Sequence, residues 1–263
     1  MAHPDLPPVS NWAVYSFRVI VKWFSFFIFG AGTLFLVFAV FPVMRLCIHP
    51  ALKFRKYARS FVSLTMRFFV NIMTGIGAVK LDADYPGAWR KLSSKIIVAN
   101  HPSLLDVVML LSLIPNADCI VRGNLSRNIV GGVIKQLYIT NSLSFEELSR
   151  ACIQSLDEGN CIIIFPEGTR TPRSGPGKMK KGAARLSLLS GSGIVPVYIG
   201  GNDKYGLGKR DPWWAYNHEE KYLYRIRMQD EISPEKYIGL PVPIGAKHLN
   251  TEITEILHHP RYT

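Results

Sequence analysis

The chain has 263 residues, enough for one sizeable domain with a full core and an appended segment, and 31 basic against 19 acidic residues give a net charge of +12. Residues 1–100 hold 12 basic and 3 acidic residues, a net +9, and the rest holds 19 and 16, a net +3. Because the basic part also contains the longest apolar run, the pattern favours an anionic membrane surface as partner and disfavours nucleic acid, for which no motif is present. Four scattered cysteines without a C-x-x-C pair predict reduced thiols in a cytosolic compartment, with no disulfide framework or zinc site.

An uncharged run near the N-terminus has the length of a membrane-crossing helix. Residues 23–44 (WFSFFIFGAGTLFLVFAVFPVM) are 22 positions without a charge, enough to cross a hydrocarbon core of about 30 Å. The run is too long for a signal-peptide core and has no small-residue cleavage site, so we expect it to be retained. Gly30, Gly32 and Pro42 leave open a bent or re-entrant hairpin in place of a straight span.

The next segment, residues 53–72, combines apolar and basic side chains. Aromatic and aliphatic residues recur at helical spacing, and much of the remainder is cationic: Lys53, Arg55, Lys56, Arg59 and Arg67. This pattern predicts a basic amphipathic helix that lies at a membrane interface or packs on the first helix. The larger number of cations after the uncharged run places the rest of the chain on the cytoplasmic side of an inner or cytoplasmic membrane. We therefore expect residues 1–74 to form the membrane anchor.

After Gly75 the pattern changes to short β-branched runs that alternate with helical segments. Strands separated by helices are typical of βαβ units, which build a mainly parallel or mixed sheet. Residues 75–263 are therefore predicted to form one α/β domain. We expect strands at 78–82, 95–99, 118–122, 161–165, 194–199 and 222–228, and helices at 103–114, 125–137, 145–157, 179–190 and 246–258.

A histidine stands where the second of these strands ends, in the segment KIIVANHPSLLD that runs from Lys95 to Asp106. The end of a strand before a helix is a common position for chemistry in α/β proteins. Asp106 could accept a hydrogen bond from one imidazole nitrogen of His101 and leave the other nitrogen as a base. Ser103 is a candidate N-cap for the helix. On this segment alone a simpler interpretation stays open, in which Asp106 is an acidic residue stabilised by the helix dipole.

A second polar loop follows the buried run that begins at Cys161, in the segment CIIIFPEGTRTPR. Gly168 allows backbone amides to approach a ligand closely, and Thr169 supplies a hydroxyl. Arg170 offers a planar fork suited to a phosphate or carboxylate, and Glu167 could orient that guanidinium or bind a substrate hydroxyl. The alternative is an exposed connection with ordinary solvated cations. The spacing excludes a P-loop.

Together, NHPSLLD and FPEGTRT resemble two motifs of the glycerolipid (lysophospholipid) acyltransferase family, N-H-x4-D and F-P-E-G-T-R-[ST]. The segment Ile194–Val197 is similar to the family's proline-containing strand motif, so the resemblance covers roughly residues 75–205. It implies an α/β domain with a mixed central sheet flanked by helices, preceded by an N-terminal two-helix membrane-anchoring motif.

The resemblance also implies a reaction, the transfer of a fatty acyl group from a thioester of acyl carrier protein or coenzyme A to the hydroxyl of a lysolipid. His101 would be the general base and Asp106 would orient it. The chain has no G-x-S-x-G nucleophile elbow, so we expect direct transfer with no acyl-enzyme, no cofactor and no metal. The acceptor's head group would be bound by the second loop and nearby cations: Glu167, Gly168, Thr169, Arg170, Lys178 and Lys181.

One departure from the family affects the acceptor. The family's second motif usually ends with an arginine that helps to hold the acceptor's phosphate, whereas Asn141 or Ser142 stands near that place here. Lys135 could compensate only as a point charge. The leading acceptor is 1-acylglycerol-3-phosphate, which would give phosphatidic acid, and the alternative is another lysolipid such as a lyso-ornithine lipid. A non-catalytic membrane-binding module is a further alternative, against which the intact pair of His101 and Asp106 argues.

Overall fold

The computed structural model describes residues 6–49, 51–121, 139–140 and 144–262, and all structural statements refer to these. The strands are β1 (Val79–Ala83), β2 (Ile96–Ala99), β3 (Ala117–Val121), β4 (Ile139–Thr140), β5 (Cys161–Ile164), β6 (Ile194–Gly201) and β7 (Tyr222–Met228). The helices are α1 (Trp12–Phe35), a π-helical turn (Leu36–Val40), α2 (Phe41–Cys47), α3 (Ala51–Gly75), α4 (Pro86–Arg90), α5 (Asp106–Leu113), α7 (Phe145–Asp157), α8 (Gly182–Ser190), a 3₁₀-helix (Pro234–Tyr237) and α9 (Val242–His258).

β2 lies at the centre of a seven-stranded sheet with the order β1-β7-β6-β2-β5-β3-β4. Neighbouring strands run parallel throughout, except that β6 and β7 are antiparallel. The sheet is therefore mixed, as predicted. Because β2 and β5 are parallel neighbours, their carboxyl ends meet at one edge of the sheet, and the two polar loops that follow them begin side by side.

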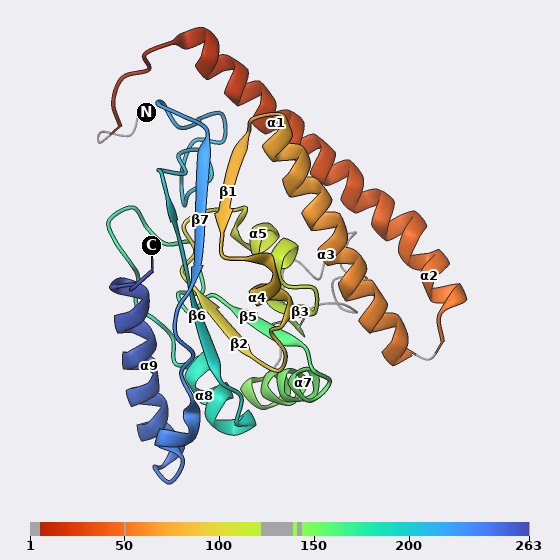
Figure 1. The fold of residues 1–263 in the computed structure, drawn as a ribbon, viewed down its shortest axis with the longest axis vertical. Coiled ribbons are helices and arrows are strands. Elements are labelled where there is room, and N and C mark those ends of the chain that lie inside the picture. Colours follow the sequence, from red (N-terminus) through yellow and green to blue (C-terminus); the bar gives the residue numbers. More distant parts are fainter. Residues whose placement is uncertain (1–5, 50, 122–138, 141–143, 263) are drawn as a thin grey trace.

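Hydrophobic cores cover both faces of the sheet, and successive side chains of β2 alternate between them. Ile97 and Ala99 belong to a core shared with α1, α3 and α5, whereas Ile96 and Val98 belong to a core shared with α7, α8 and α9. Figure 1 accordingly shows α8 and α9 on one side of the sheet and α3 and α5 on the other. A strand buried on both faces is a continuous apolar run in the sequence, which is why this one was predictable.

Helical structure runs without a break from Trp12 to Cys47, and the chain turns back only after Cys47 (Figure 1). The run at residues 23–44 therefore contains no hairpin. Pro42 follows the π-helical turn, at whose end the N–H of Phe41 bonds to the carbonyl of Leu36. This wider register accommodates a proline, which has no N–H and whose ring crowds the preceding turn. The length and composition of this helix suit a membrane crossing, and little of it is buried in the protein.

α3 does not lie apart from the α/β domain. Phe69, Val70 and Met73 are buried in the core that also contains α5. Arg59, predicted to lie on an exposed basic face, is instead buried, and two of its nitrogens bond to the two carboxylate oxygens of Asp118 at 2.7 and 2.9 Å. That prediction was wrong because the ion pair is made across 59 positions of sequence. The division of the chain at residues 74 and 75 stays a prediction, and α3 contributes to the core on the far side of it.

Most observed elements lie within a few residues of the predicted ones, with three exceptions. The helix predicted at 103–114 begins only at Asp106 with Leu105 at the N-cap position, so the expectation that Ser103 caps it was wrong. α4, β4 and the 3₁₀-helix were not predicted, because elements this short show no hydrophobic period. The helix predicted at 125–137 lies outside the described residues.

Candidate active site

His101 lies two residues beyond β2, and its ring reaches Asp106, the first residue of α5. Its Nδ1 is 2.8 Å from Asp106 Oδ2, and 17% of the histidine side chain is exposed against none of the aspartate. The carboxylate also accepts hydrogen bonds from the backbone N–H of Ser103 at 2.7 Å and from its hydroxyl at 2.5 Å. A carboxylate that only accepts requires Nδ1 to carry the hydrogen. Nε2 then carries the lone pair, and no described residue bonds to it.

The hydroxyls of Ser103 and Tyr224 support the other carboxylate oxygen of Asp106, Oδ1. The serine hydroxyl gives its one hydrogen to Asp106, so the Tyr224 hydroxyl, 2.7 Å from Ser103 Oγ, is the donor in that contact. Burial, with the charge of Asp106 adding to it, raises the pKa of Tyr224 well above its ordinary value. Tyr224 therefore keeps its hydrogen at neutral pH. No sequence pattern pointed to this residue, because it is contributed by β7, 121 positions beyond Ser103.

The loop after β5 is joined directly to His101. The backbone N–H of Thr171 bonds to the carbonyl of His101 at 2.7 Å, and the backbone N–H of His101 bonds to the Thr171 hydroxyl at 3.0 Å. The ring of Phe165 stacks on the imidazole with 4.1 Å between centroids and 24° between planes. The structure thus brings the two predicted motifs together. Thr171 stands inside the second motif, but its role depends on a partner in the first and was not foreseen.

Glu167 is buried, and it organises its own loop. One carboxylate oxygen accepts the hydroxyl hydrogen of Thr171, and the other accepts the backbone N–H of Gly177 at 3.0 Å. The expected contact that would orient Arg170 is not formed. A direct bond from Glu167 to an acceptor stays a prediction, and the observed contacts give the carboxylate the role of shaping the loop that carries Arg170.

Arg170 extends from this loop toward the connection between β6 and β7. Its Nη1 donates to the carbonyl oxygens of Leu207 and Gly208, both at 2.8 Å. Nε and Nη2 have no hydrogen-bond partner among the described residues. One side of the guanidinium fork is therefore fixed by backbone, and the other side remains for an anionic oxygen.

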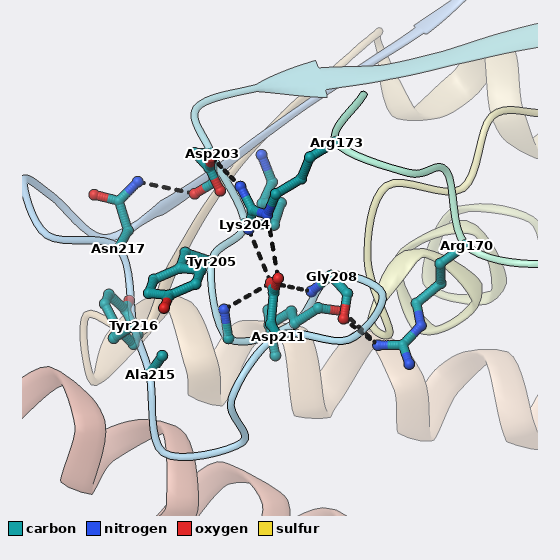
Figure 2. A network of polar contacts seen from close by, with 12 residues as sticks. Arg170, Arg173, Asp203, Lys204, Tyr205, Gly208, Asp211, Ala215, Tyr216 and Asn217 are labelled. Atoms are coloured by element: carbon teal, nitrogen blue, oxygen red, sulfur yellow. Dashed lines mark hydrogen bonds and ion pairs between the residues drawn. The ribbon is translucent and has the colours of Figure 1, made fainter. Parts of the chain in front are cut away.

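Arg173 ties the same loop to the β6–β7 connection more firmly (Figure 2). It pairs with Asp203 and with Asp211, whose Oδ2 is 2.8 Å from Arg173 Nη2. Its guanidinium also lies over the ring of Tyr205, 5.2 Å from the centroid. These partners follow Arg173 by 30 to 38 positions, and no sequence pattern identified them.

Asp211 fixes the turn that holds Arg170. Its Oδ2 accepts the backbone N–H groups of Gly206 and Gly208, at 2.9 and 2.8 Å (Figure 2). Burial by itself would raise the pKa of Asp211, but the hydrogen bonds from Arg173 and from these two amides outweigh it and lower the pKa. An ionised Asp211 thus keeps the carbonyls of Leu207 and Gly208 directed at Arg170.

A cation lies over Gly168, and it is Lys180. Gly168 has a φ of +66°, a conformation that favours glycine, and a Cβ there would come within 2.8 Å of Lys180 Nζ. Because that atom is the end of a flexible side chain, the conformation and not the space is what requires glycine. Of the other predicted binding residues, Thr169 is half-buried, Lys178 and Lys181 are exposed, and Lys135 lies outside the described residues.

The cysteines take no part in this site. None of the four forms a disulfide, and burial raises the pKa of the Cys119 and Cys152 thiols to about 12. Within the described ranges, no three histidine, cysteine or acidic side chains converge as ligands of a metal ion.

Comparison with known proteins finds relatives for the part of the chain that carries these residues. Residues 88–200, which contain all of the predicted site residues, match the family model described as Acyltransferase. The chain is 30% identical over 115 residues to the chloroplastic 1-acyl-sn-glycerol-3-phosphate acyltransferase LPAT1 of Arabidopsis thaliana, a match that covers 41% of this chain and 32% of that protein. It is 27% identical over 144 residues to the 1-acyl-sn-glycerol-3-phosphate acyltransferase of Borreliella burgdorferi, covering 52% and 57%.

The fold is similar over nearly the whole chain to a solved structure, the 1-acyl-sn-glycerophosphate acyltransferase PlsC from Thermotoga maritima. The TM-score is 0.67 at 19% identity, and the match covers 91% of this chain and 94% of that one. These two curated relatives are matched over 32% and 57% of their length. An acyltransferase domain, distantly homologous to these proteins, is therefore present in the chain.

Proposed function

We propose that this chain, whose residues 88–200 form an acyltransferase domain, transfers a fatty acyl group from a thioester to the hydroxyl of a membrane lysolipid. The observation that supports it most directly is the His101 imidazole, which has Nδ1 bound to a buried carboxylate and Nε2 free of described partners. This arrangement is that of a general base that is ready to accept a proton.

In the proposed reaction, the oxygen of the acceptor hydroxyl attacks the thioester carbonyl carbon while His101 Nε2 accepts the proton of that hydroxyl. The carbon–sulfur bond then breaks, and the leaving thiolate takes the proton from the imidazolium. Asp106 stabilises the imidazolium through the bond to Nδ1, as Phe165 holds the ring plane. General-base help of this kind contributes on the order of 10²–10⁴-fold.

We assign the acceptor's anionic head group to the Arg170 side of the site, since Arg170 keeps Nε and Nη2 available and Lys180 lies close by over Gly168. A phosphate suits both partners, and 1-acylglycerol-3-phosphate is therefore the leading acceptor. The second-motif position and Lys135 lie outside the described residues, so a different lysolipid, such as a lyso-ornithine lipid, is the alternative within the same chemistry.

The membrane contact is assigned to α1, α2 and α3. The helix from Trp12 to Cys47 leaves large apolar side chains exposed along its length, among them Phe24, Phe27, Phe35 and Phe38. A folded protein in water rarely exposes such a face, whereas a bilayer covers it favourably. The site would then face the cytoplasmic side of an inner or cytoplasmic membrane.

The test is product identification with purified full-length protein. Labelled acyl thioesters of acyl carrier protein and coenzyme A are incubated with a panel of lysolipids, and the products are identified by mass spectrometry. We expect one lysolipid to be acylated by the wild type and not by His101→Ala. Equal acylation by both proteins, or none with any acceptor, would contradict the proposal.

A further inference from the structure

The loop between β6 and β7 exposes two adjacent tryptophans beside two cations. The sequence Lys209–Trp214 is KRDPWW, and the side chains of Trp213 and Trp214 are 63% and 56% exposed. Their rings contact each other edge to face, with centroids 5.4 Å apart. Arg210, which precedes Asp211 and Pro212 in this sequence, is exposed, and Lys209 is half-buried. Neither the proposed catalytic step nor the resemblance of motifs accounts for these residues.

This loop is fixed to the first turns of the apolar helix. Lys22 of α1 donates to the carbonyl oxygens of Trp213, at 2.7 Å, and of Ala215. The rings of Trp23 and Trp213 are 5.0 Å apart and nearly perpendicular. The exposed apolar face of α1, which includes Phe27 at 71% exposure, therefore meets the loop where Trp23 contacts Trp213.

We propose that residues 209–214 are a second membrane contact, in which Trp213 and Trp214 enter the boundary between lipid headgroups and acyl chains and Lys209 and Arg210 meet anionic headgroups. Tryptophan suits that depth because its ring is apolar and its indole N–H is polar. Cations next to it add electrostatic attraction to an anionic leaflet. The inference rests on the membrane location in the proposed function, and it adds a contact outside the N-terminal anchor.

The position of this loop explains what such a contact would do for the site. The carbonyl of Leu207 accepts the backbone N–H of Leu104, at the rim of the His101 loop, and also Arg170 Nη1. Asp211 binds Arg173 from the second loop (Figure 2). Trp213 thus follows Leu207 and Asp211 by a few residues, and these two residues contact the loops that carry His101 and Arg170. We infer that a lipid contact at Trp213 sets the height of His101 and Arg170 above the acyl chains, where the head group of a lysolipid lies.

The test measures the depth of the two tryptophans in lipid vesicles. The full-length Trp12→Phe/Trp23→Phe variant keeps Trp213, Trp214 and the fully buried Trp89 as its fluorophores. It is reconstituted with anionic phosphatidylglycerol-containing vesicles that carry bromine either near the headgroup end of the acyl chain or near the bilayer centre. A matched variant adds Trp213→Phe and Trp214→Phe, which leaves only Trp89, and flotation of both establishes membrane association.

We expect strong quenching by the shallow bromines, weak quenching by the deep ones, and neither in the matched variant. Acylation of a bilayer acceptor by Trp213→Ser/Trp214→Ser should fall about tenfold, which corresponds to 1.4 kcal/mol of lost contact. The control Ile238→Ser/Leu240→Ser, at another exposed apolar pair, should leave that rate unchanged.

Each contrary result identifies what fails. A protein that floats with the vesicles but shows no quenching by shallow bromines overturns the second contact and leaves the anchor standing. Such a result would assign the surface to an acidic protein partner, for which the same cations and tryptophans are suited. Failure to float overturns the membrane location and this inference together. Quenching without any acyl transfer supports the contact while contradicting the proposed function.

Discussion

The two loops that form the site are held in opposite ways. The loop after β2 is supported at short range, since Asp106 bonds to His101 and Ser103 within five positions of sequence. The loop after β5 depends on residues far along the chain, because Arg170 and Arg173 bond to the segment 203–211. The short-range loop carries the proposed base, and the long-range loop carries the proposed anion site.

This difference has a consequence for how mutations act. Asp106 takes its three hydrogen bonds from His101 and Ser103, and the β6–β7 connection contacts this loop through the backbone bond from Leu104 to Leu207. The base should therefore depend less on that connection than Arg170 does. The guanidinium of Arg170 has no such local support and takes its orientation from Leu207 and Gly208. We therefore expect substitutions in the first loop to reduce kcat and substitutions in the second loop or its supports to raise the acceptor's KM.

The largest expected effect comes from the short-range loop. His101→Ala and Asp106→Ala should each lower kcat by about 10²–10⁴-fold, the range of general-base catalysis, with the protein still folded and membrane-bound. Asp106→Asn should be severely impaired as well, because an amide cannot stabilise an imidazolium. Steady-state kinetics on reconstituted protein, with circular dichroism as a check on folding, measure this. A His101→Ala protein that kept more than about a tenth of the wild-type rate would refute the assignment.

Arg170→Ala tests the long-range loop directly. We expect the acceptor's KM to rise about 10- to 100-fold, because a hydrogen bond to a charged group contributes about 1.5–3 kcal/mol, while the donor's KM changes little. Arg170→Lys should recover only part of the loss, since an ammonium cannot form a fork. Equal changes in both KM values would show that Arg170 does not bind the acceptor's head group.

The sequence allowed the short-range loop to be predicted in more detail than the long-range one. His101 and Asp106 lie close together along the chain, so strand-end geometry was enough to pair them. The predicted contact between Glu167 and Arg170 also assumed that neighbours interact, and it is not formed, because each side chain has a distant or buried partner instead.

The same limit applies to Arg59, which helical spacing places among exposed cations. Its actual partner, Asp118, belongs to β3 and could not be identified without the fold. Tyr224 and Asp211 were missed for the same reason. Buried strands, in contrast, were located to within one or two residues because their apolar runs are continuous.

Asp211→Ala should raise the acceptor's KM as Arg170→Ala does, but by less, because Asp211 acts on Arg170 through the turn at Leu207 and Gly208. Loss of the carboxylate frees the Gly206 and Gly208 amides and leaves Arg173 with fewer partners, so we expect the acceptor's KM to rise about tenfold. If Asp211 acts through Arg170, the double variant with Arg170→Ala should have nearly the KM of Arg170→Ala alone. Additive effects would show that Asp211 acts independently, and a fall in kcat alone would contradict the division between the loops.

Tyr224→Phe removes the hydrogen bond from Tyr224 to the Ser103 hydroxyl, which in turn supports Asp106. The net contribution of such a bond is about 0.5–1.5 kcal/mol, so kcat should fall about 2- to 10-fold with both KM values unchanged. Ser103→Ala, which removes the direct donor to Asp106, should lower kcat further. An effect of Tyr224→Phe on the acceptor's KM would show that the short-range loop is not independent of the head-group site.

The smallest effect is expected where the supports of the two loops meet, at Lys204. Its ammonium donates to the carbonyl of Asn202 at 2.5 Å and lies 4.8 Å from the ring centroid of Tyr224. Burial lowers the pKa of Lys204 to about 8 from 10.5. Between these two values the unfolded chain binds more protons than the folded one, so the contribution of Lys204 to the free energy of unfolding rises with pH over that window.

The melting temperature of the wild type, measured in detergent, should therefore increase relative to that of Lys204→Met as pH rises from about 8 to about 10.5. The same comparison with Lys247→Met, at an exposed lysine of α9, controls for the loss of a surface charge. A difference between wild type and Lys204→Met that stays constant across this window would mean that Lys204 is not desolvated, and that the two supports do not meet at a buried charge.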